Sequence, residues 1–129
     1  MLFHYCHKFC QYICLTKAIF KKLQASGMTI SLQIAYSKEN GTTFDYEYYM
    51  KNHMDLLSTG MTLHWESVQV TKGLSGGPDT PAPFHAITTV LYKDQAALEA
   101  SMALAGPAFA DVPNYYDGQP TVLIGEVLD

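Results

Sequence analysis

Aromatic side chains and one histidine are concentrated in residues 44–53, which read FDYEYYMKNH. If this segment is helical, Tyr49, His53 and either Leu56 or Leu57 share one face, because residues three and four apart are neighbours on a helix. His53 then lies on the apolar side of the helix, which faces the protein interior. A histidine in that position either meets a fixed hydrogen-bond partner in the core or faces a cavity.

An imidazole that faces a cavity can take up and release a proton near neutral pH, which suits it to a carbon acid or a phenol. For that role, a carboxylate or a tyrosine must fix the tautomer of His53. Asp111 is one candidate for this partner, and Tyr49 precedes His53 by one helical turn. The alternative is that Asp111 and Asn114 only organise the local backbone through side-chain hydrogen bonds. Likewise, at least one of the three tyrosines before His53 is expected to serve core packing alone.

Two other histidines, His64 and His85, do not have the spacing of a metal site. His64 and Glu66 alternate onto one side of a predicted strand, and Trp65 falls on the other side. H-x-E also occurs in zinc deaminases, yet the P-C-x-x-C that they require is absent. The sequence contains no H-x-H and no pair of histidines four residues apart. We therefore expect His64 and His85 to lie at the surface or at loop ends, and we expect neither a metal nor a cofactor.

Charge is distributed unevenly along the 129 residues. Residues 1–27 carry four lysines and no acidic residue, whereas residues 28–129 carry four lysines and all twelve acidic residues, a formal charge of −8. The chain has no arginine. A domain this acidic, without a guanidinium group, is poorly suited to bind nucleic acid or phosphate, and no glycine-rich phosphate loop is present. With 48% hydrophobic and 16% charged residues, the composition is that of one packed globular domain.

The first 27 residues differ from the rest in composition. They contain all three cysteines, Cys6, Cys10 and Cys14, whose spacing matches no usual zinc motif and is more simply explained by an apolar helix stripe. Lys8 interrupts the hydrophobic run, so we expect no membrane span, and no ordered secretory signal is recognisable, so we expect a cytoplasmic protein. The segment is either an amphipathic surface helix or an upstream extension that is not part of the fold. We favour the extension and place the domain at residues 28–129.

The residues after this extension follow the order β-α-β-β-α-β. Apolar and polar residues alternate over 29–37, which indicates a first strand. Thr42-x-x-Asp45 resembles a capping box that opens the aromatic helix, and the helix is expected to end near Thr59, before Gly60. The remaining predicted elements are strands at 63–71, 84–92 and 121–128, a loop at 72–83, a helix from the Asp94 cap to about Ala105 that Gly106-Pro107 ends, and a linker at 108–120.

This order predicts an α+β, ferredoxin-like fold, in which a four-stranded antiparallel sheet carries both helices on one face. The third and fourth predicted strands are apolar at both odd and even positions, unlike a sheet with one solvated face. A partner is therefore expected to cover the second face. The simplest arrangement is a homodimer in which two sheets meet face to face. We expect this dimer not to need residues 1–27.

With the helix motif in place, the chain resembles the EthD family, named for a protein of bacterial alkyl-ether degradation clusters. Residues 44–53 are similar to the family's F-x3-Y-(Y/W)-x3-H helix. Residues 110–115, ADVPNY, are similar to its A-D-(V/I)-x-N-(Y/F) segment, and residues 125–127, GEV, close the last strand as they do in the family. The three motifs together cover 28–127.

The resemblance implies a ferredoxin-like chain that pairs into a dimeric α/β barrel with an interior cavity. Proteins of this fold include cofactor-free isomerases, polyketide cyclases, small monooxygenases and proteins without a known activity, so the fold does not specify the reaction. Matched residue by residue, His53, Tyr49 and Asp111 are the candidate catalytic residues. The candidate ligand-binding residues are Phe44, Tyr48, Trp65 and Asn114.

Two functions of different classes are consistent with these residues. The first is a cofactor-independent enzyme of the isomerase, cyclase, lyase or small monooxygenase type, which acts on a small aromatic or apolar organic molecule with His53 as acid and base. The second is a non-catalytic binding or accessory protein of a degradation or biosynthetic pathway. Binding requires only an apolar cavity, whereas catalysis requires an arranged pair of polar groups.

Overall fold

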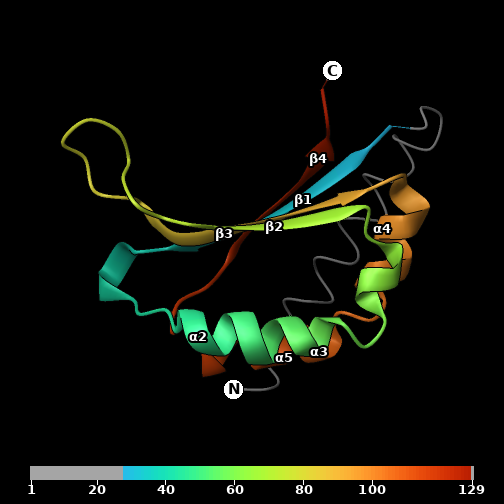
Figure 1. Ribbon diagram of the computed structural model, residues 1–129, viewed down its shortest axis with the longest axis horizontal. Helices are drawn as coiled ribbons and strands as arrows, with labels where there is room; N and C mark the ends of the chain where they lie inside the picture. The colour runs from blue at the N-terminus through green and yellow to red at the C-terminus, as the bar shows by residue number, and fades with distance from the viewer. Residues whose placement is uncertain (1–27, 129) are drawn as a thin grey trace.

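Four antiparallel strands form a single sheet in the computed structural model, which describes residues 28–128 (Figure 1). The strands are β1 (Ile30–Ser37), β2 (Ser67–Lys72), β3 (Phe84–Tyr92) and β4 (Thr121–Glu126), and their order across the sheet is β2-β3-β1-β4. The predicted ferredoxin-like α+β topology is confirmed. The predicted N-terminal extension, 1–27, with its three cysteines, lies outside the described residues.

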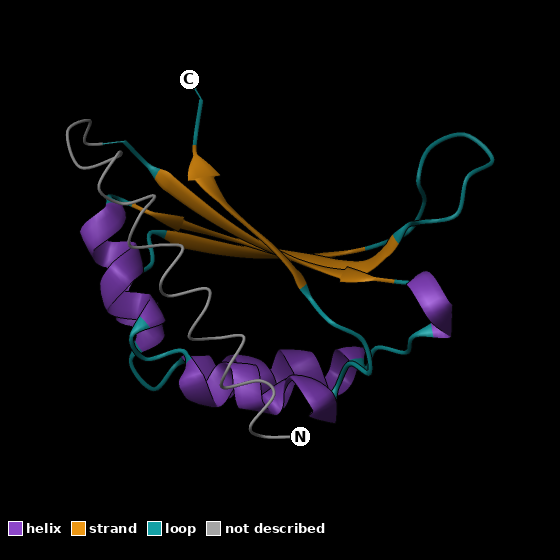
Figure 2. Ribbon diagram, turned by 180° about the vertical axis from the view of Figure 1, so that it is seen from behind, coloured by secondary structure: helices purple, strands orange, loops and turns teal. Residues whose placement is uncertain are grey.

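Helical segments cover one face of the sheet. Between β1 and β2, the helices α2 (Tyr46–Tyr48) and α3 (Met54–Leu57) flank a π-helical turn, η2 (Tyr49–His53). Between β3 and β4 lie α4 (Gln95–Met102) and α5 (Gly106–Asp111), followed by the 3-10 turn η4 (Val112–Asn114). Two other 3-10 turns are η1 (Glu39–Gly41) and η3 (Met61–His64). Figure 2 shows these helices on the same side of the sheet.

Helix α2 starts differently from the prediction. Asp45, rather than Thr42, is its N-cap: the backbone of Asp45 is extended and its carboxylate accepts the N–H of Tyr48 at 3.0 Å. Thr42 instead donates its hydroxyl to the carbonyl of Ser37. The predicted capping box is therefore wrong, because the hydroxyl of Thr42 binds the end of β1.

Two other boundaries are also corrected. Gly106-Pro107 begins α5 instead of ending α4, since a proline in the first helical turn sacrifices no intrahelical hydrogen bond. The predicted linker at 108–120 is thus largely helical. The second strand begins at Ser67 rather than Leu63, because Met61 is buried in the core and the chain around it turns as η3 against α4.

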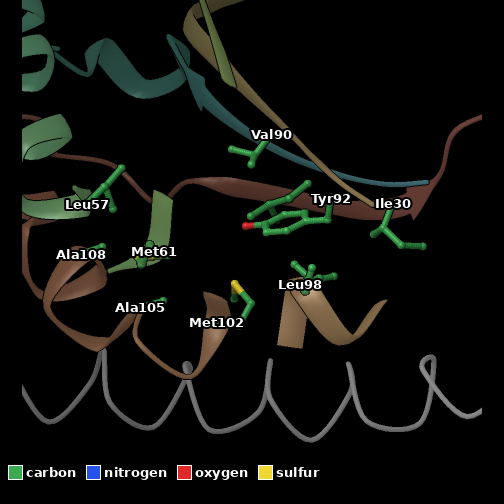
Figure 3. Packing of buried hydrophobic residues seen from close by; sticks show 11 residues of the cluster. Ile30, Leu57, Met61, Val90, Tyr92, Leu98, Met102, Ala105 and Ala108 are labelled. Carbon is green, nitrogen blue, oxygen red and sulfur yellow. The ribbon is translucent and has the colours of Figure 1, made fainter. Parts of the chain in front are cut away.

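The main hydrophobic core fills the space between the sheet and α3, α4 and α5. Figure 3 shows Tyr92 of β3 directed toward Leu98 and Met102 of α4. The phenol of Tyr92 donates to Ser101 Oγ at 3.1 Å, and the indole N–H of Trp65 donates to the same oxygen at 3.2 Å. Both buried polar groups are therefore satisfied without leaving the apolar layer.

An aromatic cluster forms a second core at the other end of the sheet. Tyr36 on β1 and Tyr49 on η2 face each other edge to face, with ring centroids 5.7 Å apart. Tyr115 and Tyr116, which follow η4, pack on Tyr36 at 5.6 and 5.2 Å. This edge-to-face geometry is the arrangement that aromatic rings prefer. The cluster fixes the helix that carries His53 against the sheet.

The sheet face away from the helices, here called the outer face, carries no charged residue. The register of the strands places small polar and aliphatic side chains there, and no helix of residues 28–128 covers them (Figure 2). A sheet face that meets water normally carries polar residues, and seven of the twelve residues on this face are polar but uncharged. The outer face consists of Ser31, Gln33, Ala35, Ser67, Gln69, Thr71, Ile87, Thr89, Leu91, Thr121, Leu123 and Gly125.

The sheet of one chain is open, with β2 and β4 at its two edges. The barrel predicted for a dimer therefore does not exist within a single chain. Of the helices in residues 28–128, none has the length and apolar character needed to cross a membrane.

Candidate active site

His53 lies at the end of the π-helical turn and is directed into the protein. In this turn the N–H of Met54 donates to the carbonyl of Tyr49, five residues earlier, which is the π-helical hydrogen bond. Single π-turns within a helix occur frequently at functional sites. The His53 ring stacks on Tyr49 with centroids 5.0 Å apart and planes 20° apart, and only 5% of the residue is exposed.

Asp111, the last residue of α5, binds the His53 ring. His53 Nδ1 lies 3.0 Å from Asp111 Oδ2. The other carboxylate oxygen, Oδ1, accepts the phenol of Tyr48 at 2.7 Å and the side-chain amide of Asn114 at 2.9 Å. Residues 58 positions apart in the sequence thus meet because α5 ends beside η2.

The charges of this pair follow from burial and hydrogen bonding. Burial raises the pKa of Asp111, but the hydrogen bonds from Asn114, Tyr48 and His53 outweigh it and hold this pKa below 3.8. Burial lowers the pKa of His53 below 6.5, although Asp111 acts in the opposite direction. At neutral pH the pair is therefore a carboxylate and a neutral imidazole. Because a carboxylate only accepts, Nδ1 carries the ring proton and Nε2 presents its lone pair.

Tyr115 faces this lone pair, and Tyr36 lies behind Tyr115. The phenol oxygen of Tyr115 lies 3.5 Å from His53 Nε2, at the outer limit of a hydrogen bond, and 2.8 Å from the phenol oxygen of Tyr36. Beyond them, Tyr49 is hydrogen-bonded to Thr88 on β3. Burial, and then the neighbouring Tyr49 and Tyr115, raise the pKa of Tyr36 far above its usual range, so its phenol stays protonated.

A cavity between the sheet and the helices opens onto these groups. The space available to the centres of water-sized molecules is about 50 Å³. Its walls are mostly apolar, with Leu32 and Val90 from the sheet and Met102 from α4. His53 and the three tyrosines at positions 36, 49 and 115 line one side. The cavity thus combines an apolar body with a small polar wall, as ligand sites usually do.

The structure brings the three candidate catalytic residues, His53, Tyr49 and Asp111, into one cluster. The candidate ligand-binding residues are more dispersed. Trp65 lines the cavity, but Tyr48 and Asn114 contact Asp111 from outside it. The remaining one, Phe44, does not line the cavity: it packs in the aromatic cluster and stacks on His85 at 5.9 Å.

Tyr115, Tyr36 and Thr88 line the cavity but were not among the candidate residues from the sequence. Tyr115 ends the ADVPNY motif, and Tyr36 and Thr88 fall on the inward positions of their strands, so a signal existed for each. The motif alone did not distinguish a cavity-lining phenol from a packed one.

The other two histidines of the described residues lie outside the cluster. His64 ends η3, and its predicted alternation with Glu66 on a strand is wrong because neither residue lies in β2. His85 is the second residue of β3, and its Nε2 lies 3.0 Å from the carbonyl oxygen of Thr42. Within residues 28–128, no three His, Cys, Asp or Glu side chains gather where they could hold a metal ion.

Comparison with known proteins gives matches at the level of structure. No protein-family model and no curated protein matches the sequence. The crystal structure of an EthD-like protein from Ralstonia eutropha JMP134 is 27% identical, with a TM-score of 0.70 over 79% of this chain and 94% of that chain. An ethyl tert-butyl ether d (EthD) family protein from Bacillus halodurans C-125 is 20% identical, with a TM-score of 0.62 over 78% of this chain and all of that chain.

The lowered pKa of His53 predicts a pH dependence of stability. Folded His53 binds a proton less readily than unfolded His53, so its contribution to stability is complete above about pH 6.5 and is lost as the pH falls through the lowered pKa. Urea denaturation between about pH 5 and about pH 8 should show this loss in the wild type and less of it in His53→Gln. His64→Gln, which changes a histidine outside the site, should retain it. An equal slope in the wild type and His53→Gln would contradict the assignment of a buried neutral imidazole.

Proposed function

Because the chain has an EthD-family fold, we propose that it is a cofactor-independent enzyme that acts on a small aromatic or apolar organic molecule. The reaction is of the isomerase, cyclase, lyase or small monooxygenase type, and His53 is its general acid and base. One observation carries the proposal: His53 lines the cavity while its Nδ1 is held 3.0 Å from an oxygen of the partly buried Asp111 carboxylate. A histidine that only filled space in the core would not need both to line a cavity and to contact a carboxylate.

The pair is arranged for proton transfer. Neutral His53 accepts a proton at Nε2 from an acidic C–H or O–H of the bound molecule, which becomes an anion. The imidazolium that forms is stabilised by Asp111 through the Nδ1–H bond. The same proton then returns to another atom of the substrate. Tyr48 and Asn114 act on this step indirectly, because they keep Asp111 ionised and in place.

The apolar walls serve two purposes in this scheme. They hold the body of the ligand by burial, and Trp65 and Tyr49 offer aromatic surfaces for it. They also exclude water, which strengthens the electrostatic interaction between the imidazolium and the anion. A ligand with a flat apolar body suits these walls better than a sugar or a nucleotide, and the cavity must widen to admit an aromatic ring, because a cavity that binds benzene measures about 150 Å³.

A non-catalytic binding or accessory protein is the second candidate. The observation that favours it is the predominance of apolar side chains in the cavity wall, since such a wall is sufficient to hold an organic molecule for a partner enzyme. In that case His53 and Asp111 would contribute to ligand affinity, and no turnover would depend on them.

Hydrogen exchange on a carbon acid separates the two functions. In D2O, the wild type should accelerate exchange of the acidic C–H hydrogens of an aromatic ketone such as 2-tetralone, followed by proton NMR. His53→Gln should lose about a hundredfold or more of the acceleration, and Asp111→Asn should lose part of it. His64→Gln, outside the cavity, should match the wild type.

Binding of the ketone without acceleration by the wild type would support the binding protein instead. A variant His53→Gln that accelerates exchange as well as the wild type would refute the role of this residue. Circular dichroism of each variant shows whether it is folded, so that a loss of rate can be assigned to the site.

We also propose that two chains associate through their outer faces to form a barrel. Exposed Leu123, partly buried Ile87 and Leu91, and the lack of any charged side chain on the outer face support association with a second copy. Face-to-face packing would leave the cavity of each chain on the helical side of its own sheet.

A lysine on the outer face should disrupt this dimer. Leu123, 62% exposed, lies on that face, whereas Leu63, 84% exposed, lies in η3 on the helical side. Sedimentation of the full chain should show a dimer for the wild type and for Leu63→Lys, and a monomer or a weaker dimer for Leu123→Lys. A wild type that is monomeric at micromolar concentration would overturn the barrel.

A further inference from the structure

The polar wall of the cavity contains a connected row of hydroxyl groups in addition to His53. Tyr115 contributes the phenol nearest to His53 Nε2, at 3.5 Å, and Tyr36 lies directly behind it, at 2.8 Å from Tyr115. Both residues are buried, with exposed fractions of 3% and 1%, and both line the cavity. They come from different elements, the end of η4 and strand β1.

The directions of these hydrogen bonds follow from the carboxylate at the end of the row. Asp111 accepts from Nδ1–H of His53, so Nε2 is an acceptor and Tyr115 must donate in that contact. A phenol has a single proton, so when that of Tyr115 points to Nε2, Tyr36 donates in the contact with Tyr115. Every proton of the row therefore points toward His53 and then toward Asp111, and Tyr36 makes Tyr115 a better donor.

The contact between Tyr115 and His53 is the weakest link of the row. At 3.5 Å it is much longer than the 2.8 Å between the two phenols. A ligand can therefore replace it at little cost, if its own proton goes to Nε2 and its own oxygen accepts from Tyr115. The bond between Tyr36 and Tyr115 is retained in that exchange and keeps the donor in position.

We propose that Tyr115 is a second functional residue of this site, which donates a hydrogen bond to an oxygen of the bound molecule, and that Tyr36 positions it. This inference rests on the proposed function only in placing the reacting molecule in the same cavity. It narrows the ligand to one chemical class: a phenol or an enolisable carbonyl compound, with an apolar body and an oxygen adjacent to the acidic proton.

His53 and Tyr115 have different roles on such a molecule. His53 Nε2 takes the O–H or C–H proton, and the negative charge that remains develops on the ligand oxygen. The donated hydrogen bond of Tyr115 stabilises that oxygen, and because it is stronger to an anion than to a neutral oxygen, it favours the ionised ligand. No proton leaves Tyr115 in this step, and the bound state is an imidazolium next to a phenolate or enolate.

Binding of 4-nitrophenol tests the inference, because the visible absorption of this phenol reports its ionisation. Nitrobenzene, which lacks the hydroxyl, is the matched probe. The wild type should bind 4-nitrophenol more tightly than nitrobenzene and should shift its spectrum toward the anion. Tyr115→Phe should weaken the binding of 4-nitrophenol about tenfold or more and reduce its spectral shift, and it should leave the binding of nitrobenzene unchanged. Tyr36→Phe should cause a smaller change of the same kind.

Tyr116→Phe is the control variant. Tyr116 is a buried phenol adjacent in sequence, but it donates to the carbonyl of Ser37 and does not line the cavity. Its removal should change neither probe. Equal weakening of both probes in Tyr115→Phe would indicate a packing role and overturn the inference, as would a wild type that does not prefer 4-nitrophenol. If Tyr115→Phe does not fold, Tyr36→Phe tests the inference instead. An unchanged spectrum and affinity of 4-nitrophenol in Tyr36→Phe would refute the role of the hydrogen-bonded row.

The binding of 4-nitrophenol and the exchange of ketone hydrogens test different claims. A preference for 4-nitrophenol that depends on Tyr115, in a protein that accelerates no exchange, would keep this inference and refute catalysis. Exchange that depends on His53 but is equal in Tyr115→Phe and the wild type would keep catalysis and refute the role of Tyr115.

Discussion

The hydrogen bond between buried His53 and partly buried Asp111 is the interaction on which the rest of the site depends. A polar group left unpaired in an apolar interior costs about 1–3 kcal/mol, so an inward histidine on this helix needs a partner. Asp111 supplies it, and in turn needs Tyr48 and Asn114 to remain ionised beside a cavity. The pair leaves one imidazole nitrogen, with its lone pair, directed at Tyr115.

The fold is arranged so that this pair can form between distant parts of the chain. The aromatic cluster anchors η2 on β1, and α5 brings Asp111 to the same depth. The π-turn at Tyr49 stacks its ring on His53. The sheet contributes apolar side chains and, through Tyr36 and Thr88, two hydroxyl groups. The cavity lies where the hydrophobic core meets the aromatic cluster.

Much of the fold and part of the candidate site were predictable from the sequence. Alternation in β1, the apolar run of β3 and the Asp94 cap indicated the order of elements, and helical spacing placed His53 inward. The contact with Asp111 was a candidate only, because spacing does not measure a distance across 58 residues. Helix α5 was missed because Gly-Pro usually ends a helix but here begins one. Tyr36 and Tyr115 were missed because inward tyrosines in a core and in a cavity have the same pattern.

The tautomer of His53 is the central claim, and nitrogen NMR of the imidazole measures it directly. At neutral pH, the wild type should show a protonated Nδ1 and an unprotonated Nε2 for this residue, and Asp111→Asn should weaken or reverse that preference. A proton on Nε2, or a charged ring at neutral pH, in the wild type would contradict the account, because no lone pair would then face the cavity.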